Sequence, residues 1–174
     1  MDTVLITAGK YKGRKIATPG GATHPMGSRE KLALFNMLTG EIEGATVLDA
    51  FAGSGALGIE ALSRGASEVV FVEKNEKAAE IIKQNLKSLE IENAKVIKNS
   101  VSNITDDLGE FEVVLADPPY DNFKITEVLL LTKFVKNGGI LVLSHPGDAP
   151  DLEGLSLLKT RSYAGANLSI YVKN

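Results

Sequence analysis

Short apolar runs alternate with amphipathic stretches along most of the chain, and this alternation constrains the fold more than any other feature. Runs typical of strands lie at residues 45–51, 68–73, 94–99, 111–117 and 138–144. Helical patterns lie between them, at residues 56–64, 76–89, 101–108 and 125–135. Strands that alternate with helices in this way form parallel sheets with right-handed crossovers. The pattern therefore predicts a doubly wound α/β domain.

Both ends of the chain depart from this alternation. Residues 155–163 and 167–173 both have strand patterns, and only AGA separates them. Such a tight connection forces antiparallel pairing, because a parallel pair needs a long crossover. At the other end, residues 3–8 and 14–18 predict a hairpin around GKYKG. Ser28 is expected to cap a helix over 29–38.

Composition excludes several classes of protein. With 174 residues, 44% hydrophobic and 24% charged, the chain suits a single globular domain. It has no cysteine, which excludes disulfides, thiolate zinc sites and a cysteine nucleophile, and its two histidines predict no metal site. The apolar stretch at 127–135 is shorter than the roughly 18 residues that a membrane span needs. The N-terminus does not resemble a secretory signal, so we expect a cytoplasmic protein without a membrane partner.

The charge is unevenly distributed. Residues 1–40 have a formal charge of +4 and the remainder −7, which together give the net −3. The candidate basic arm surrounds Tyr11 and continues downstream; it comprises Lys10, Lys12, Arg14, Lys15, His24 and Arg29. Basic side chains of this kind neutralise phosphates without reading base sequence. The pattern favours nucleic-acid binding, although on charge alone a solvated hairpin is an equal alternative.

The segment DAFAGSGALG, at residues 49–58, joins a predicted strand to a predicted helix. Its glycines Gly53, Gly55 and Gly58 form G-x-G-x-x-G, and Glu73 follows Gly53 by 20 residues, as in dinucleotide sites. Asp49 argues against a dinucleotide, because a carboxylate at the strand end repels a pyrophosphate. It would instead attract an ammonium group. S-adenosylmethionine fits this polarity, and Glu73 is placed to accept hydrogen bonds from its ribose hydroxyls.

A second motif, Asp117-Pro118-Pro119-Tyr120, directly follows the fourth predicted strand. Its prolines fix two φ angles and donate no hydrogen bonds, so the turn is stiff and its carbonyls are free acceptors. With the Asp117 carboxylate, these carbonyls can accept hydrogen bonds from an exocyclic amino group. Tyr120 can stack on the base that carries this group. The motif predicts methylation of a base amino group.

The sequence resembles the RsmD-type small-subunit (16S) ribosomal RNA guanine-N2 methyltransferases over nearly its whole length. The resemblance is carried by AGKYKGRKI (8–16), REKLALFNML (29–38), VLDAFAGSGALGIEALSRGA (47–66), VVFVEKN (69–75), DPPY (117–120) and YAGANLSIY (163–171). It implies a Rossmann-like class I S-adenosylmethionine-dependent methyltransferase fold. This fold has a mostly parallel seven-stranded sheet, an antiparallel C-terminal strand and an N-terminal β-hairpin extension.

The resemblance also assigns roles to residues. It places the cofactor against Asp49, Phe51, Gly53, Gly55, Glu73, Lys74, Ser100, Val101 and Asp117. Asp117 to Tyr120 would hold the guanine N2, and the basic arm would contact ribosomal RNA in a largely assembled small subunit. Residues 1–40 would be an RNA-binding extension of a catalytic domain at 41–174, in a protein that we expect to be monomeric.

Two segments depart from the family pattern. Residues 24–29 read HPMGSR where the family usually has Arg-Pro-Thr-x-Asp-Arg, and Ser100-Val101 stands where it usually has Asp-Ala. The cofactor's adenine would then meet a hydroxyl group or a backbone carbonyl. Three alternatives stay open: an adenine-N6 DNA methyltransferase, an NAD-binding redox module, and a non-catalytic ribosome assembly factor.

Overall fold

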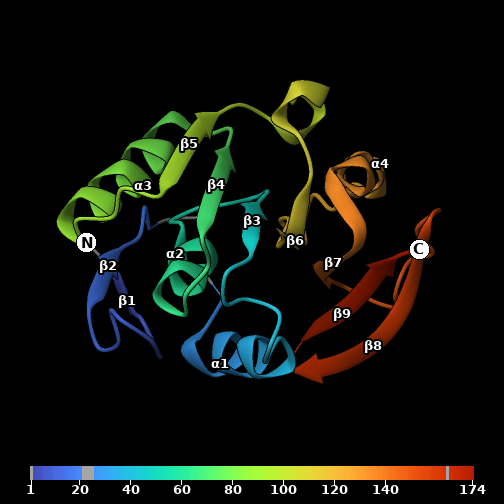
Figure 1. The fold of residues 1–174 in the computed structure, drawn as a ribbon, viewed down its shortest axis with the longest axis horizontal. Helices are drawn as coiled ribbons and strands as arrows, with labels where there is room; N and C mark the ends of the chain where they lie inside the picture. Colours follow the sequence, from blue (N-terminus) through green and yellow to red (C-terminus); the bar gives the residue numbers. More distant parts are fainter. Residues whose placement is uncertain (1, 21–25, 164) are drawn as a thin grey trace.

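A seven-stranded sheet dominates the computed structural model, which describes residues 2–20, 26–163 and 165–174 (Figure 1). Its strands are β3 (Thr46–Asp49), β4 (Glu68–Glu73), β5 (Ala94–Lys98), β6 (Phe111–Ala116), β7 (Val135–His145), β8 (Leu155–Tyr163) and β9 (Ala166–Lys173). They lie in the order β5-β4-β3-β6-β7-β9-β8. The first five are parallel, β9 runs antiparallel to both β7 and β8, and the predicted mixed sheet is confirmed.

Helices cover both faces of this sheet. They are α1 (Ser28–Met37), α2 (Ala56–Ser63), α3 (Glu76–Ser88) and α4 (Ile125–Leu131), with short 3₁₀ segments η1 (Val101–Asn103), η2 (Asp106–Leu108) and η3 (Thr132–Phe134). On β3, Val47 packs into the core on the side of α1, α2 and α3, and Leu48 packs into the core on the side of α4. Neighbouring residues of a strand point to opposite faces, so a strand buried on both sides is apolar throughout.

The N-terminal hairpin pairs β1 (Thr3–Leu5) with β2 (Lys15–Ala17) as a separate antiparallel sheet, which confirms the predicted hairpin. Its Ile6 and Ile16 are 2% exposed and belong to the same core cluster as Leu34 and Phe35 of α1. The hairpin is therefore packed on the body of the protein through apolar contacts.

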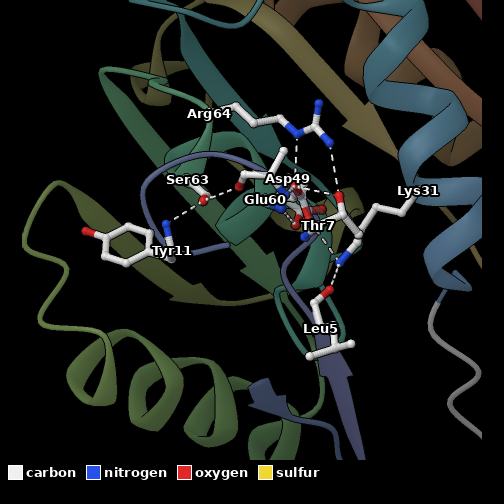
Figure 2. Close-up of polar contacts among 10 residues, drawn as sticks. Leu5, Thr7, Tyr11, Lys31, Asp49, Glu60, Ser63 and Arg64 are labelled. Carbon is white, nitrogen blue, oxygen red and sulfur yellow. Dashed lines mark hydrogen bonds and ion pairs between the residues drawn. The ribbon is translucent and has the colours of Figure 1, made fainter. Parts of the chain in front are cut away.

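A buried carboxylate fastens this N-terminal segment as well (Figure 2). Glu60 of α2 accepts hydrogen bonds from the backbone and hydroxyl of Thr7 and from the backbone of Ala8. It also pairs with Lys31 of α1 at 3.1 Å and with Arg64 at 2.9 Å. The ammonium group of Lys31 donates in addition to the carbonyl of Leu5. One side chain thus links the hairpin, α1 and α2.

The structure corrects the prediction for Ser28, which is the first residue of α1 and not its cap. Gly27 occupies the cap position with an extended backbone, and no side chain of a described residue caps the helix. The carbonyl of Gly27 already accepts the first helical hydrogen bond, from the backbone of Lys31 at 2.9 Å. The helix therefore begins one residue earlier than expected.

The predicted helix over 125–135 and strand over 138–144 also differ from the structure. The α-helix ends at Leu131, and the chain passes through η3 into β7, which begins at Val135. Val135 pairs with Phe111 at the start of β6, and a register irregularity follows. Pairing in the sheet outweighs the local helical pattern at this point. In the part of the chain that the structure describes, no helix has the length and apolarity to cross a membrane.

Candidate active site

A cavity of about 1000 Å³ opens at the carboxyl ends of the parallel strands. It lies where β3 adjoins both β4 and β6, so the chain connections leave in opposite directions on its two sides. Open α/β sheets bind ligands at such a switch point. The lining includes these residues predicted from the sequence: Phe51, Gly53, Glu73, Lys74, Ser100, Val101, Asp117, Pro118, Pro119 and Tyr120.

The glycine-rich turn after β3 lines part of the cavity, through residues 51–54. Gly55 has a φ angle of 83° at the N-cap of α2, a left-handed conformation that favours glycine. Gly58 has a different reason, because a Cβ there would lie 2.2 Å from the ring of Phe71 on β4. Gly55 thus shapes the turn beside the cavity, and Gly58 lets α2 pack closely on the sheet.

Glu73 ends β4 at the edge of the cavity. Its two carboxylate oxygens accept hydrogen bonds from the backbone of Gly53 and of Asn75, each at 2.8 Å. A carboxylate oxygen can accept more than one hydrogen bond, so Glu73 keeps acceptor capacity toward the cavity. It joins the turn after β3 to the turn after β4 and leaves a negative charge between them.

Asp49, at the end of β3, is 1% exposed and is not among the residues that line the cavity. One carboxylate oxygen accepts a hydrogen bond from the backbone of Gly58 at 3.0 Å, and the other is buried with no partner among the described residues. Burial raises its pKa to about 7; the Gly58 N–H opposes this shift, while the charges of Asp117 and Glu73 add to it. Asp49 therefore lies behind the glycine turn, beside the cavity but not in its lining.

The Asp-Pro-Pro-Tyr turn lines the opposite side of the cavity. Burial raises the pKa of Asp117 to about 6, and the neighbouring Ser144 hydroxyl works in the other direction. The hydroxyl groups of Tyr120 and Ser144 are hydrogen-bonded to each other. Burial also raises the pKa of Tyr120, so this phenol is protonated at neutral pH. The turn thus offers one carboxylate acceptor and one anchored aromatic ring.

Sequence reasoning missed several residues of this cavity. Ser144 of β7 is 3% exposed, lines the cavity and is hydrogen-bonded to Tyr120 of the Asp117–Tyr120 turn. Glu30 of α1 and Tyr163 at the end of β8 line it as well. No local signal could identify Ser144, because its role depends on β7 lying beside β6.

The basic arm is not gathered at the cavity. Its residues Lys10, Lys12, Arg14 and Lys15 are all exposed. The turn of the hairpin lies at the C-terminal end of α2, where the backbone of Lys10 donates to Ser63 at 2.8 Å. The cavity adjoins the N-terminal end of the same helix, and eight residues of α-helix span about 12 Å.

Single residues of the arm have other surroundings. Arg14 donates to the carbonyl of Ser88 at the end of α3, at 3.3 Å, so part of its role is to cap that helix. Arg29 is exposed in the first turn of α1, next to the cavity-lining Glu30. His24 lies outside the described residues. Within those residues no cluster of three or more potential metal ligands occurs.

Two proteins illustrate the similarity in sequence. "Putative rRNA methyltransferase YlbH" of Bacillus subtilis is 33% identical over 180 residues, which cover 97% of this chain and 98% of that protein. "Ribosomal RNA small subunit methyltransferase D" of Haemophilus influenzae is 34% identical over 180 residues, which cover 97% and 93%.

Solved structures agree with this similarity. "Putative methyltransferase yhhF from Escherichia coli" superposes with a TM-score of 0.89 at 28% identity, covering 99% of this chain and 98% of that one. Magnesium protoporphyrin IX methyltransferase from Synechocystis, solved with bound S-adenosylmethionine, has a TM-score of 0.66 over 83% and 77% of the two chains. At 17% identity, this second similarity concerns the fold alone.

The fold is that of the class I S-adenosylmethionine-dependent methyltransferases. Residues 4–172 match the protein family described as "Conserved hypothetical protein 95". Together with the two sequence relatives, this match over nearly the whole chain identifies the protein as a member of the RsmD and YlbH family of methyltransferases.

Proposed function

We propose that the protein transfers a methyl group from S-adenosylmethionine to the exocyclic N2 of a guanine in small-subunit ribosomal RNA. One observation carries the proposal: the glycine turn with Glu73 and the Asp117–Tyr120 turn line a single cavity. The first group suits a cofactor with a ribose, and the second suits a base with an amino group. The relative in Haemophilus influenzae, named for the small ribosomal subunit, supports this choice of RNA.

The residues present fit S-adenosylmethionine. A volume of about 1000 Å³ is in the upper range of small-molecule sites and accommodates the cofactor together with a base. Glu73 has free acceptor capacity for the ribose hydroxyls, and Phe51, Lys74, Ser100 and Val101 line the space around it. Gly53 lines the cavity beside Glu73, while Asp49 and Gly55 would hold the turn from behind.

When bound, the cofactor supplies a methyl group on a cationic sulfur, and the sulfur keeps the electron pair of the broken carbon–sulfur bond. The chain's own part is to orient the amino nitrogen toward that methyl carbon, which is where most of the rate gain arises. Asp117 accepts a hydrogen bond from the amino group and stabilises the positive charge that develops as the nitrogen–carbon bond forms. The amino proton then passes to the Asp117 carboxylate, and Tyr120 stacks on the base.

The exposed Lys10, Lys12, Lys15 and Arg29 would neutralise RNA phosphates. Since the hairpin turn lies one length of α2 away from the cavity, its phosphate contacts would be several nucleotides from the target base. We therefore propose that residues 1–40 extend the footprint of a catalytic domain at 41–174. Such an extended footprint fits a folded RNA in a largely assembled small subunit.

The test is transfer of labelled methyl from S-adenosylmethionine to small ribosomal subunits that lack their native methylations, followed by nuclease digestion. We expect N2-methylguanosine as the labelled product, with more label in subunits than in free ribosomal RNA. Label in DNA as N6-methyladenine and none in RNA would replace this proposal with a DNA substrate. Cofactor binding without any transfer would favour a non-catalytic assembly factor, and binding of NAD would favour a redox module.

A further inference from the structure

We propose that Ser144 is a positioning residue that links the catalytic turn into a directed chain of hydrogen bonds. In this chain the Tyr120 hydroxyl donates to Ser144, and the Ser144 hydroxyl donates to the Asp117 carboxylate. The inference rests on the proposed function, because it assigns the remaining acceptor capacity of Asp117 to the amino group of the target base.

The sheet register brings these side chains together. Ala116 of β6 pairs with Leu143 of β7, so the next position along each strand places Asp117 beside Ser144. Both residues lie on the face of the sheet toward the cavity, which they line together with Tyr120. Ser144 is 3% exposed, and its hydroxyl is hydrogen-bonded to that of Tyr120.

The number of available protons fixes the direction of the chain. Each hydroxyl has one proton to donate, and an ionised carboxylate has none. If Ser144 donated to Tyr120, its single proton would not be available to Asp117, whose pKa the Ser144 hydroxyl lowers against the effect of burial. Tyr120 stays protonated at neutral pH because burial raises its pKa; the hydrogen bond with Ser144 opposes this rise, and the negative charge of Asp117 adds to it. The arrangement that satisfies all three groups runs from Tyr120 through Ser144 to Asp117.

The chain has two consequences for the site. It holds the phenol edge of Tyr120, so the ring is fixed at an angle that leaves one face to the cavity. It also keeps Asp117 ionised near neutral pH, although burial favours the protonated form. An ionised Asp117 can accept the amino hydrogen of a base, whereas a protonated Asp117 would compete with it as a donor.

Other charged groups surround Asp117. Asp49 lies behind the glycine turn and couples to it electrostatically, and the residues that line the same cavity include Glu30, Glu73, Lys74, Asp121 and Glu127. His145, the neighbour of Ser144 on β7, is hydrogen-bonded to Ser169 of β9. These charged groups are present in every variant at position 144, so their presence does not account for a difference between Ser144→Ala and Ser144→Thr.

The decisive measurement is the titration of the Asp117 side-chain carboxyl, followed by carbon-13 NMR in the intact protein without substrate. The resonance is identified by its absence in Asp117→Asn. We expect Ser144→Ala to raise the titration midpoint by about one pH unit, the value of one hydrogen bond to a charged group. Ser144→Thr, which restores a hydroxyl, should return the midpoint to within a few tenths of a pH unit of the original. An unchanged midpoint in Ser144→Ala would overturn the proposal.

Two further variants sharpen this measurement. Ser169→Ala removes another buried serine, on β9 and outside the cavity lining, and should leave the Asp117 midpoint unchanged. Tyr120→Phe removes the first donor but keeps the bond from Ser144, so it should raise the midpoint less than Ser144→Ala does. A larger effect in Tyr120→Phe would mean that Tyr120 contacts Asp117 directly, which contradicts the proposed chain.

Enzyme kinetics give an independent readout. The acid limb of the methyl-transfer rate should move upward in pH in Ser144→Ala by the same amount as the NMR midpoint, and Ser144→Thr should restore it. A moved NMR midpoint with no transfer to any RNA would support the hydrogen-bond chain and refute the proposed function. Methyl transfer by Ser144→Ala with the same acid limb as the wild type would refute the hydrogen-bond chain and would not contradict the proposed function.

Discussion

Glu60 and Asp49 are both buried carboxylates, with 0% and 1% of their surfaces exposed, yet their surroundings differ in every other respect. Glu60 receives five donors, from the backbone and hydroxyl of Thr7, the backbone of Ala8, and the side chains of Lys31 and Arg64. Within the described part of the chain, Asp49 receives one donor, the backbone of Gly58, and its second oxygen has none.

The pKa values follow these surroundings. Burial disfavours the charge of Glu60, but the Thr7 N–H, Arg64 and Lys31 outweigh it and lower the pKa. Burial of Asp49 is opposed by one N–H only, and the pKa rises to about 7. A fully paired carboxylate fastens the N-terminal segment to the body, whereas an incompletely paired one lies beside the cavity. The number of hydrogen-bond donors thus accounts for the opposite pKa shifts of these two buried carboxylates.

The largest effect is expected for Glu60→Ala. It leaves the 1%-exposed Lys31 with the Leu5 carbonyl as its remaining partner, and an unpaired buried charge costs about 3–5 kcal/mol. Urea unfolding would measure this loss. Glu80→Ala, which removes an exposed glutamate of α3, should change the free energy of unfolding by no more than about 0.5 kcal/mol.

A second replacement tests the reason for that loss. The double variant Glu60→Ala with Lys31→Met should regain part of the stability, because it no longer buries a lone cation. If Glu60→Ala and Glu80→Ala had the same free energy of unfolding, Glu60 would not fasten the segment. The difference in pairing between Glu60 and Asp49 would then have no effect on stability.

Asp49→Asn should change how stability depends on pH. The folded-state pKa of about 7 lies above the ordinary value of 3.8, so the folded protein binds a proton more tightly than the unfolded chain. The stability from this group is therefore present below about pH 4 and is lost as pH rises through 7, by up to about 4 kcal/mol. The free energy of unfolding of Asp49→Asn should not show this loss. The stability of the variant relative to the wild type should therefore increase between pH 4 and 8. Parallel stability curves would contradict the prediction.

Asp117→Ala should reduce methyl transfer by about 100-fold, since it removes the acceptor for the amino group and its developing charge. Cofactor affinity, measured by calorimetry, should change much less. Asp148→Ala, which removes an exposed aspartate outside the cavity lining, serves as the control and should keep the wild-type rate. Full activity in Asp117→Ala would show that this carboxylate has no part in the reaction.

The smallest effect concerns the segment that Glu60 fastens. Replacing Lys10, Lys12 and Lys15 with alanine should weaken RNA binding about tenfold and flatten its salt dependence by about 0.7 for each lost phosphate contact. Arg14 stays, because it donates to the end of α3. Replacement of the exposed α3 residues Lys77, Lys83 and Lys87 with alanine removes the same charge. It should alter the salt dependence of RNA binding less. Equal slopes would leave the hairpin as a solvated basic surface.

Much of the fold follows from local sequence patterns. The apolar runs predicted the strands of the mixed sheet, and the three-residue AGA connection required the antiparallel hairpin of β8 and β9. The pattern failed at Val135, where pairing with Phe111 in the sheet draws a residue out of a helical stretch. It failed again at Ser28, because the backbone of Gly27 already begins the helix.

In the cavity, too, some features follow from local sequence and others from tertiary packing. Glycine spacing and the Asp117–Tyr120 turn are encoded within a few residues, and sequence alone identified them as parts of a site. The sequence could not show that Asp49 lies behind the turn, since its depth depends on how closely Gly58 packs against Phe71. Nor could it show that the basic hairpin turn adjoins Ser63, at the far end of α2 from the cavity.

The sequence by itself determined the order of strands and helices, the two turns at the strand ends and the chemistry that these turns can perform. Only the tertiary structure decided which distant groups meet: Glu60 with Lys31, and Ser144 with Tyr120. The physical reason is that periodicity and turn geometry are local, whereas these contacts depend on the packing of separate elements. Sheet register brings β7 beside the Asp117–Tyr120 turn, and apolar packing brings the hairpin and α1 onto α2.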